Sequence, residues 1–344
     1  MKNFSFKNDY LEGCHPDILD ALVRSNLVQQ NNYGYDEYSE EARKLIQQKI
    51  KNQNADIYFV SGGTQANLLI ISSILRPHES VISAETGHIF TNETGAIEAT
   101  GHKIHSVETK NGKLNPSDIK SVLDSHTNRP HQLKQKLVYI SNSTEIGTIY
   151  SKKELEDLFA FCQKNNLYLF LDGARLGQAL TSEINDLTLK DIACLTDIFY
   201  LGVTKNGALL GEAIIILNDN LKEDFDFHIK QKGAMLAKGR LLGIQFRELM
   251  KNDLYFDLAR IANSQAMKIK STFEKQNFSF LSETFTNQIF PILSNSQIKK
   301  LSEKFDFFVW KKMDDNHSAI RIVTSWATTD EVVEEFVREI HNLI

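Results

Sequence analysis

The chain has 344 residues, of which 42% are hydrophobic and 24% are charged, so it has enough apolar surface to bury a core, and disorder is excluded for most of its length. Its net charge of −5 makes it a poor candidate for nucleic-acid binding, which needs a basic face, so no nucleic-acid partner is expected. The three cysteines, Cys14, Cys162 and Cys194, are far apart, so no disulfides are expected. The sequence has no apolar leader and no run of 18 apolar residues, so we expect a cytoplasmic protein without membrane contacts.

The first two thirds of the chain alternate apolar runs typical of buried strands with segments of helical spacing. Strands are expected at 57–60, 80–83, 137–141, 167–171, 198–201 and 213–217, and helices at 65–75, 116–123 and 151–164. Two of the helices have start signals, Asn115 before Pro116 and the capping box from Ser151 to Glu154. This alternation predicts an α/β fold with a mainly parallel central sheet and helices on both faces.

From about Gly239 the pattern changes. A long segment of helical period, 240–267, is followed by shorter strand candidates at 307–310 and 319–323 and by a final helix from about Thr329 to Ile344. We therefore expect a large domain over residues 1–245, which includes the N-terminal segment, and a smaller α+β domain over residues 246–344.

A glycine turn lies between the first expected strand and its helix. Glycine lets the backbone approach a ligand closely, and the free amides at a helix start suit a phosphate, so Gly62, Gly63 and Thr64 are candidate phosphate ligands. A plain strand-to-helix turn is an equally good explanation of this motif alone. The chain contains neither GxGxxG nor GxxxxGK[ST], which disfavours dinucleotide and Walker-type nucleotide binding.

An acid and a lysine each follow an apolar strand. Asp172 comes directly after 167–171, at the strand end where α/β ligand crevices form, and Lys205 follows 198–201 with small and polar neighbours. A lone surface lysine is the usual alternative for such a residue. Together with the glycine turn, however, they match the needs of pyridoxal phosphate: a lysine for the Schiff base, an acid for the pyridine nitrogen and a phosphate cradle.

Six motifs, in the same order along nearly the whole chain, carry a resemblance to a known family. The sequence resembles the threonine aldolase and β-eliminating lyase family of fold-type-I pyridoxal-phosphate enzymes. Phenylserine aldolase-like members have the most similar motif sequences. The resemblance implies the aspartate aminotransferase fold. The motifs are Ser61-Gly-Gly-Thr-Gln-Ala-Asn67, Ala84-Glu-Thr-Gly-His88, Asn142-Ser-Thr-Glu-Ile-Gly-Thr148, Asp172-Gly-Ala-Arg175, Gly202-Val-Thr-Lys205-Asn-Gly and Arg321-Ile-Val-Thr-Ser-Trp326.

The resemblance implies roles for the residues of these motifs. Lys205 would bind pyridoxal 5'-phosphate as a Schiff base, Asp172 would pair with the pyridinium nitrogen, and the glycine turn would hold the phosphate. His88 would stack on the cofactor ring and could assist proton transfer. Arg175, close to the cofactor, and Arg321 would hold the substrate carboxylate, for which the guanidinium fork is suited.

Other family features lie outside these motifs. Tyr33, with Gly34, matches a motif that in relatives reaches a neighbouring subunit's site, so a homodimer or homotetramer with shared active sites is expected. Asp9 belongs to a segment that borders the pocket in relatives, although a solvated loop acid is an equally good explanation. The basic segment 230–240 takes the place of a loop that approaches the phosphate in relatives.

The chain departs from the family where the β-hydroxyl base is concerned. Many threonine aldolases have Asn-Thr-His near Asn142, where the histidine contributes to the site, whereas here Glu145 ends the corresponding Asn142-Ser-Thr-Glu run. The base therefore stays open between His88 and a water positioned by it or by neighbouring polar groups. No metal is expected, because His102 and His105 would face opposite sides of a short strand.

The resemblance thus implies a pyridoxal-phosphate-dependent aldehyde-lyase similar to low-specificity L-threonine aldolases. Its substrate would be a small amino acid, such as L-threonine, L-allo-threonine or phenylserine, which it would cleave to glycine and an aldehyde. Two alternatives stay open: β-elimination from another amino acid on the same scaffold, and a non-catalytic protein of this fold.

Overall fold

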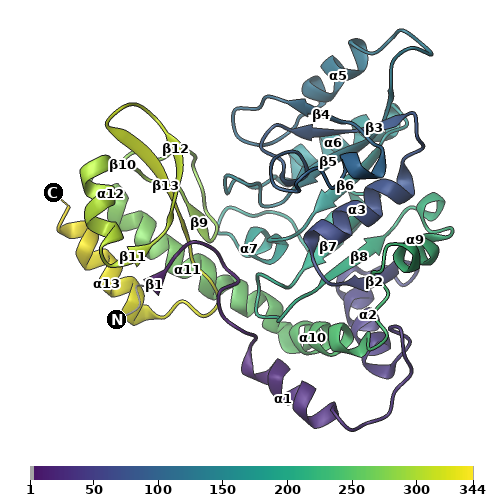
Figure 1. The fold of residues 1–344 in the computed structure, drawn as a ribbon, viewed down its shortest axis with the longest axis horizontal. Helices are drawn as coiled ribbons and strands as arrows, with labels where there is room; N and C mark the ends of the chain where they lie inside the picture. The colour runs from purple at the N-terminus through teal and green to yellow at the C-terminus, as the bar shows by residue number, and fades with distance from the viewer. Residues whose placement is uncertain (1–3, 344) are drawn as a thin grey trace.

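A seven-stranded sheet forms the centre of the larger part of the computed structural model, which describes residues 4–343 (Figure 1). Every strand is parallel to its neighbours except β8, which is antiparallel to both β7 and β2. The mainly parallel sheet is as predicted. In sheet order the strands are β2 (Asp56–Val60), β8 (Glu212–Ile216), β7 (Ile198–Gly202), β6 (Tyr168–Asp172), β5 (Lys134–Ser141), β3 (Glu79–Ala84) and β4 (Ile104–Val107).

Helices cover both faces of this sheet, because its apolar strands need a hydrophobic partner on each side. Two separate hydrophobic cores result, one per face. The predicted N-caps are present: Asn115 and Ser151 each accept a backbone N–H of their own helix in a capping box. The first core includes side chains of α1 (Pro16–Ser25), α2 (Glu37–Ile50), α5 (Pro116–Asp124), α6 (Lys152–Lys164), α7 (Leu176–Leu180), α8 (Leu189–Cys194) and α10 (Arg240–Met250), and the second those of α3 (Gly63–Ile74), α4 (His88–Thr91) and α9 (Phe225–Gln231). Short 3₁₀ helices are η1 (Glu98–Thr100), η2 (Asp219–Leu221) and η3 (Lys251–Asp253).

The smaller part of the molecule is a four-stranded antiparallel sheet with helices on one face (Figure 1). Both strands predicted here and the final helix are present, although Ile344 lies outside the described residues. The strands are β9 (Gln288–Ile289), β10 (Ile292–Ser294), β12 (Phe308–Lys312) and β13 (His317–Val323), and the helices are α11 (Leu254–Lys275), α12 (Asn295–Ser302) and α13 (Asp330–His341).

The long helix predicted over 240–267 is wrong as a single element. α10 ends at Met250 and α11 begins at Leu254, because Asn252 and Asp253 have left-handed backbone conformations, with φ of 55° and 60°. Asn and Asp adopt this conformation more readily than other residues with a Cβ atom, so an apolar period that continues across them does not keep the helix unbroken.

The N-terminal segment contacts both parts of the molecule. β1 (Phe4–Ser5) pairs in parallel with β11 (Phe305–Asp306), and the Phe6 carbonyl accepts a 2.9 Å hydrogen bond from the N–H of Val323 in β13. Ten residues later α1 packs on the first core of the large sheet. The boundary between the two expected domains, at residues 245 and 246, lies inside α10, and we keep this division as a proposal. Residues 1–3 and 344 are not among the described residues.

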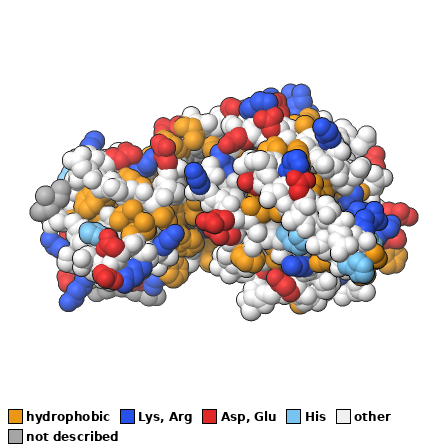
Figure 2. All heavy atoms as spheres, turned by 90° about the horizontal axis from the view of Figure 1, so that it is seen from above, with side chains coloured by type: hydrophobic (Ala, Val, Ile, Leu, Met, Phe, Trp, Pro, Cys, Tyr) orange, Lys and Arg blue, Asp and Glu red, His pale blue; other side chains and the backbone are white. Residues whose placement is uncertain are grey.

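On the face shown in Figure 2, acidic and basic side chains are interspersed and do not gather into one basic stripe. Between residues 4 and 343, no helix combines the length and the apolar character needed to cross a bilayer. The same residues contain no group of three or more His, Cys, Asp or Glu side chains that could hold a metal ion.

Candidate active site

The ends of the central strands surround a cavity of about 310 Å³, which we call the strand-end cavity. Carboxyl ends of parallel strands meet at one edge of a sheet, so residues that follow different strands come together there. Six of the predicted site residues line it: Gly62, Gly63, Thr64, His88, Asp172 and Lys205. They share it with Tyr10, Ser61, Glu145, Ala174, Tyr200, Thr204 and Glu212.

The glycine turn presents the start of α3 to this cavity. Gly62 is the N-cap residue, and among the described residues no side chain caps the first amides of the helix. A Cβ atom on Gly63 would lie 3.2 Å from the Tyr200 hydroxyl, whereas one on Gly62 would meet open space. A 12-residue helix with free N-terminal amides, a positive dipole end and no bulk in front of it suits an anion such as phosphate.

Asp172 is the last residue of β6 and is only 3% exposed. Its Oδ2 accepts a 2.5 Å hydrogen bond from the Tyr139 hydroxyl and a longer one, 3.4 Å, from Asn67 Nδ2, and its Oδ1 accepts from the N–H of Ala174 at 3.0 Å. These donors fix the carboxylate in one orientation. A buried carboxylate held in this way can keep a cationic nitrogen protonated beside it.

Lys205 lies in the loop after β7, and its half-buried side chain lines the cavity. Burial and the nearby charge of Arg175 lower its pKa, although Asp9, Glu145 and Asp172 act in the opposite direction. Within residues 4–343 its ammonium group has no hydrogen bond or ion pair. A lysine with a lowered pKa and a free nitrogen is suited to attack a carbonyl carbon.

His88 begins the short helix α4 on another wall of the cavity. Its Nδ1 lies 2.6 Å from Oε1 of buried Glu93, and the same oxygen accepts a 3.0 Å hydrogen bond from Asn67, which also contacts Asp172. Burial disfavours the charged imidazole, but the Glu93 hydrogen bond and the charges of Glu145 and Asp172 outweigh it and raise the pKa of His88.

Arg175 and Asp9, both predicted site residues, form a buried ion pair. Arg175 Nε and Nη2 donate to the two Asp9 oxygens at 2.7 and 3.0 Å, and Asn287 Nδ2 donates to Asp9 at 2.8 Å. Burial acts to raise the pKa of Asp9, but the Arg175 charge and these hydrogen bonds lower it. Asp9 is therefore not a solvated loop acid, and Arg175 keeps only Nη1 outside this pair.

Arg321, on β13 of the smaller sheet, has fewer hydrogen-bond partners than Arg175 among the described residues. Its Nη2 donates to the Lys7 carbonyl at 3.1 Å, while its Nε is buried without a hydrogen-bond partner in the described chain. The guanidinium lies over the Trp310 ring, 5.0 Å from its centroid. Burial and the charge of Arg175 lower the pKa of Arg321 to about 10, while Asp9 and Glu145 oppose this shift.

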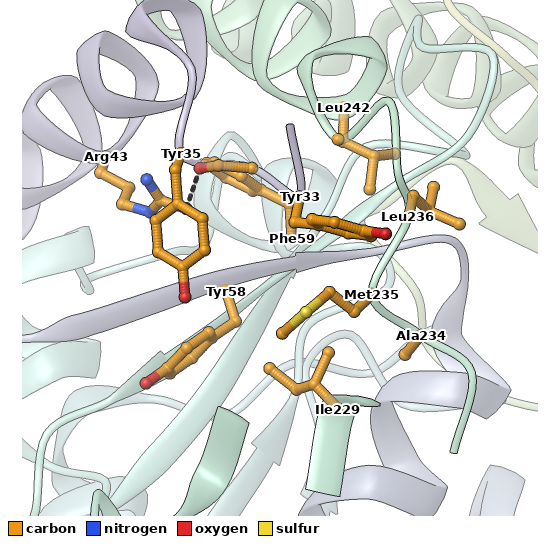
Figure 3. Close-up of a pocket in the computed structure, with 12 residues that line it drawn as sticks. Tyr33, Tyr35, Arg43, Tyr58, Phe59, Ile229, Ala234, Met235, Leu236 and Leu242 are labelled. Carbon is orange, nitrogen blue, oxygen red and sulfur yellow. Dashed lines mark hydrogen bonds between the residues drawn. The ribbon is translucent and has the colours of Figure 1, made fainter. Parts of the chain in front are cut away.

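Tyr33 does not reach the strand-end cavity of its own chain. It lines a second, mainly apolar pocket together with Tyr35, Tyr58 and Met235 (Figure 3). The Tyr33 N–H donates to the Ala237 carbonyl at 3.1 Å, and Lys230 Nζ lies 4.8 Å from the Tyr33 ring centroid. The Tyr33-Gly34 motif and the basic segment 230–240, although far apart in the sequence, therefore form one surface.

Residues that line the cavity or hold its groups in place were not all predicted from the sequence. Glu212 is the clearest of them: burial raises its pKa to about 8 against the opposing charge of Lys205, and Thr204 Oγ1 donates to its Oε1 at 3.0 Å. An acid placed directly before the apolar run 213–217 was the available signal. Tyr139 left no signal, because it stands inside an apolar strand and only the fold directs its hydroxyl toward Asp172.

Comparison with known proteins gives consistent results. The profile of the family described as Beta-eliminating lyase matches residues 15–296. A protein of Pseudomonas aeruginosa named low specificity L-threonine aldolase is 30% identical over 342 residues, which cover 97% of this chain and 96% of the relative. A solved structure of Leishmania major threonine aldolase is 48% identical, covers 99% of both chains and superposes with a TM-score of 0.97.

A more distant structure bears on the fold alone. Aspartate aminotransferase of Thermus thermophilus, at 13% identity, superposes with a TM-score of 0.73 over 99% of this chain and 92% of that chain. The predicted aspartate aminotransferase fold is confirmed by this similarity and by the mainly parallel sheet.

Proposed function

Since the chain belongs to the β-eliminating lyase family, we propose that it is an aldehyde-lyase that cleaves a β-hydroxy-α-amino acid to glycine and an aldehyde. The proposed substrates are L-threonine, L-allo-threonine or a related compound such as phenylserine. One structural observation carries the proposal: a glycine turn, a fixed carboxylate and a free lysine line one cavity. It is supported by a relative named for this activity, which aligns along 97% of the chain.

The family depends on pyridoxal 5'-phosphate, and the cavity fits this cofactor. The uncapped start of α3 offers amides for the phosphate, Asp172 is an acceptor for a protonated ring nitrogen, and Lys205 has no competing partner among residues 4–343. We propose that Gly62, Gly63 and Thr64 hold the phosphate, that His88 lies against the ring and that Lys205 binds the cofactor covalently. When bound, the cofactor withdraws electrons from the substrate Cα, so that a bond to this atom can break.

We propose that the substrate carboxylate binds to Arg175 and Arg321. They lie at the seam between the part built on the seven-stranded sheet and the part built on the four-stranded sheet. Arg321 offers a buried Nε without a partner in the described chain, so an incoming carboxylate would complete its hydrogen bonding. Arg175 offers Nη1 beside its pair with Asp9. With the carboxylate held there, we propose that the substrate amine faces Lys205 and that its side chain faces His88 and Glu145, which line the same cavity.

We also propose a cytoplasmic homodimer or homotetramer. Its support is the outer face of α1 and the following turn, where Leu19, Val23 and Leu27 are 53%, 69% and 92% exposed. Apolar side chains spaced in this way along one element are typical of an interface. The Tyr33 surface shown in Figure 3 is proposed to face a neighbouring subunit's cavity.

The first test is the Lys205→Ala variant. We expect the visible absorption band of the covalently bound cofactor to disappear and glycine formation from L-threonine to fall at least about 1,000-fold, because the nucleophile is lost. Lys164→Ala, at the exposed end of α6, is the matched control and should retain both. A Lys205→Ala enzyme with the wild-type band and turnover would contradict the proposal.

Product analysis of the wild-type protein separates the reactions that the family supports. Glycine with an aldehyde supports the proposed cleavage, whereas pyruvate with ammonia identifies β-elimination at the same site. A wild-type protein that shows no cofactor band after incubation with pyridoxal phosphate would support the non-catalytic alternative.

A further inference from the structure

Five carboxylates lie in or beside the strand-end cavity, and four of them are engaged. Each of the four accepts a hydrogen bond of 3.0 Å or shorter from a side chain, or is paired with a ring nitrogen at such a distance, within the described chain. Asp9 is paired with Arg175, Glu93 with His88, Asp172 with Tyr139 and Glu212 with Thr204. A carboxylate tied to such partners orients them, and its lone pairs are less available to a substrate proton.

Glu145 is the fifth carboxylate, and its surroundings differ. Within residues 4–343 its only hydrogen-bond partner is Ser141 Oγ, at a long 3.4 Å. Its side chain is half-buried and lines the cavity beside His88 and Lys205. Among the described carboxylates of the cavity, Glu145 is therefore the one with no hydrogen bond of 3.0 Å or shorter on either oxygen, whereas Glu212 has only its buried Oε2 without a partner.

The backbone around Glu145 is held in place although its side chain is free. Glu145 follows β5 in a tight turn, in which the Thr144 N–H donates to the Thr148 carbonyl and the Gly147 N–H donates to the Thr144 carbonyl, both at 2.9 Å. The two threonine hydroxyls are 2.7 Å apart and fix the turn from the side. A base is effective when it stays in position without being neutralised. The turn holds the Glu145 backbone in position, and the long contact with Ser141 leaves the carboxylate free.

The charge of Glu145 reaches the groups that would surround a substrate. It acts on His88, Lys205, Arg175 and Arg321, which are the proposed ring-stacking, cofactor-binding and carboxylate-binding residues. Glu145 is therefore near both the amine end and the carboxylate end of the proposed substrate position. A β-substituent of an amino acid bound there would point into this space.

His88, the other candidate, has fewer free acceptor atoms than Glu145. Its Nδ1 is engaged by Glu93 at 2.6 Å, which leaves Nε2 as the one ring atom that could accept a proton from a bound molecule. The observations therefore favour the free carboxylate over the ring.

We propose that Glu145 is the base that accepts the proton of the substrate's β-hydroxyl group, an inference that rests on the proposed function. As the proton moves to a Glu145 oxygen, the O–H electron pair forms the C=O bond of the aldehyde, and the Cα–Cβ bond breaks. The electron pair of that bond stays with Cα, which takes up one proton to complete glycine, so no oxidant or further reactant is needed.

The test compares two reactions of the same holoenzyme. Cleavage of phenylserine needs a β-hydroxyl base, whereas exchange of a glycine α-proton with D₂O, followed by NMR, needs the cofactor, Lys205 and the arginines but no such base. For Glu145→Gln, which keeps the size of the side chain, we expect cleavage to fall about 100- to 10,000-fold. Glycine exchange and the cofactor absorption band should stay within about twofold of wild type, since no other step uses this carboxylate.

Two further variants keep the result decisive. Glu145→Asp retains a carboxylate one methylene further away and should cleave at a rate between those of wild type and Glu145→Gln. Glu283→Gln removes an exposed acid at a neighbouring cleft and should change neither reaction. Wild-type cleavage in Glu145→Gln, or an equal loss of cleavage and exchange in both Glu145 variants, would overturn the inference. Absence of cleavage in the wild-type enzyme would instead overturn the proposed function.

Discussion

Arg175 and Arg321 lie near each other at the seam between the two parts of the molecule, yet their surroundings differ. Arg175, at the start of α7 (Leu176–Leu180), meets a buried carboxylate through two nitrogens. Arg321, on β13 of the smaller sheet, has a backbone carbonyl, two aromatic rings and a buried Nε without a partner in the described chain. Removal of one partner from a buried ion pair destabilises the fold, whereas a guanidinium with a spare donor can bind an anion that arrives from outside.

The strongest test of this difference is to remove the carboxylate that neutralises Arg175. Asp9→Ala leaves a buried positive charge without its partner, so we expect the free energy of unfolding to fall by about 3–5 kcal/mol, measured by denaturant unfolding. Asp306→Asn is the control, because the Lys7–Asp306 pair is exposed, 3.8 Å apart and worth at most about 1 kcal/mol. Equal losses in the two variants would show that Arg175 and Asp9 have no special structural role.

Removal of the Arg321 charge should affect substrate binding and leave the fold largely intact. For Arg321→Gln we expect KM for the amino acid to rise about 100-fold, the loss of one or two charge-assisted hydrogen bonds, with an unchanged cofactor band. Arg338→Gln, exposed near the end of α13, is the control with unchanged KM. If Arg321→Gln destabilised the protein as much as Asp9→Ala and left KM unchanged, the contrast between the two arginines would be lost.

A smaller effect is expected at His88, whose charge also depends on one buried partner. Because the folded state raises the pKa of His88, the resulting stability is fully present below the unfolded pKa of 6.5 and is lost as pH rises through the folded pKa. Glu93→Gln should lower the pKa of His88, seen by NMR titration of the ring. The wild type should have a higher free energy of unfolding at pH 5.5 than at pH 9, and Glu93→Gln should reduce this difference by about 1 kcal/mol. An unchanged His88 titration would show that Glu93 does not control the charge of this ring.

The sequence allowed the prediction of residues that follow parallel strands. Gly62, Asp172 and Lys205 each come after an apolar run, and the carboxyl ends of parallel strands meet at one edge, so their convergence follows from the pattern. Glu212 escaped prediction because β8 runs antiparallel to its neighbours. The first residue of that strand therefore lies at the edge where the last residues of the others lie, and the direction of a buried apolar run cannot be read from its composition.

Long-range pairing was also beyond the sequence. Asp9 and Arg175 are 166 positions apart, and no periodicity links them, so the choice between a solvated acid and a buried ion pair depended on the folded chain. The same holds for the break between α10 and α11, where the apolar period continues but Asn252 and Asp253 turn the backbone. Glu145 was placed in the site region by its motif, but its lack of strong partners became visible only in three dimensions.

The segment around Asp9 is translated long before several of the groups that hold it. Asn287 lies 278 positions after Asp9, and Arg321 lies 314 positions after Lys7. Contacts with such a separation form late, because a long stretch of chain must be closed before they contribute stability. A nascent chain released before residue 287 therefore lacks the amide that holds Asp9 and the strand that pairs with β1. Closure of the seam thus requires translation through Arg321, and shorter copies keep an open site that proteases and chaperones can recognise.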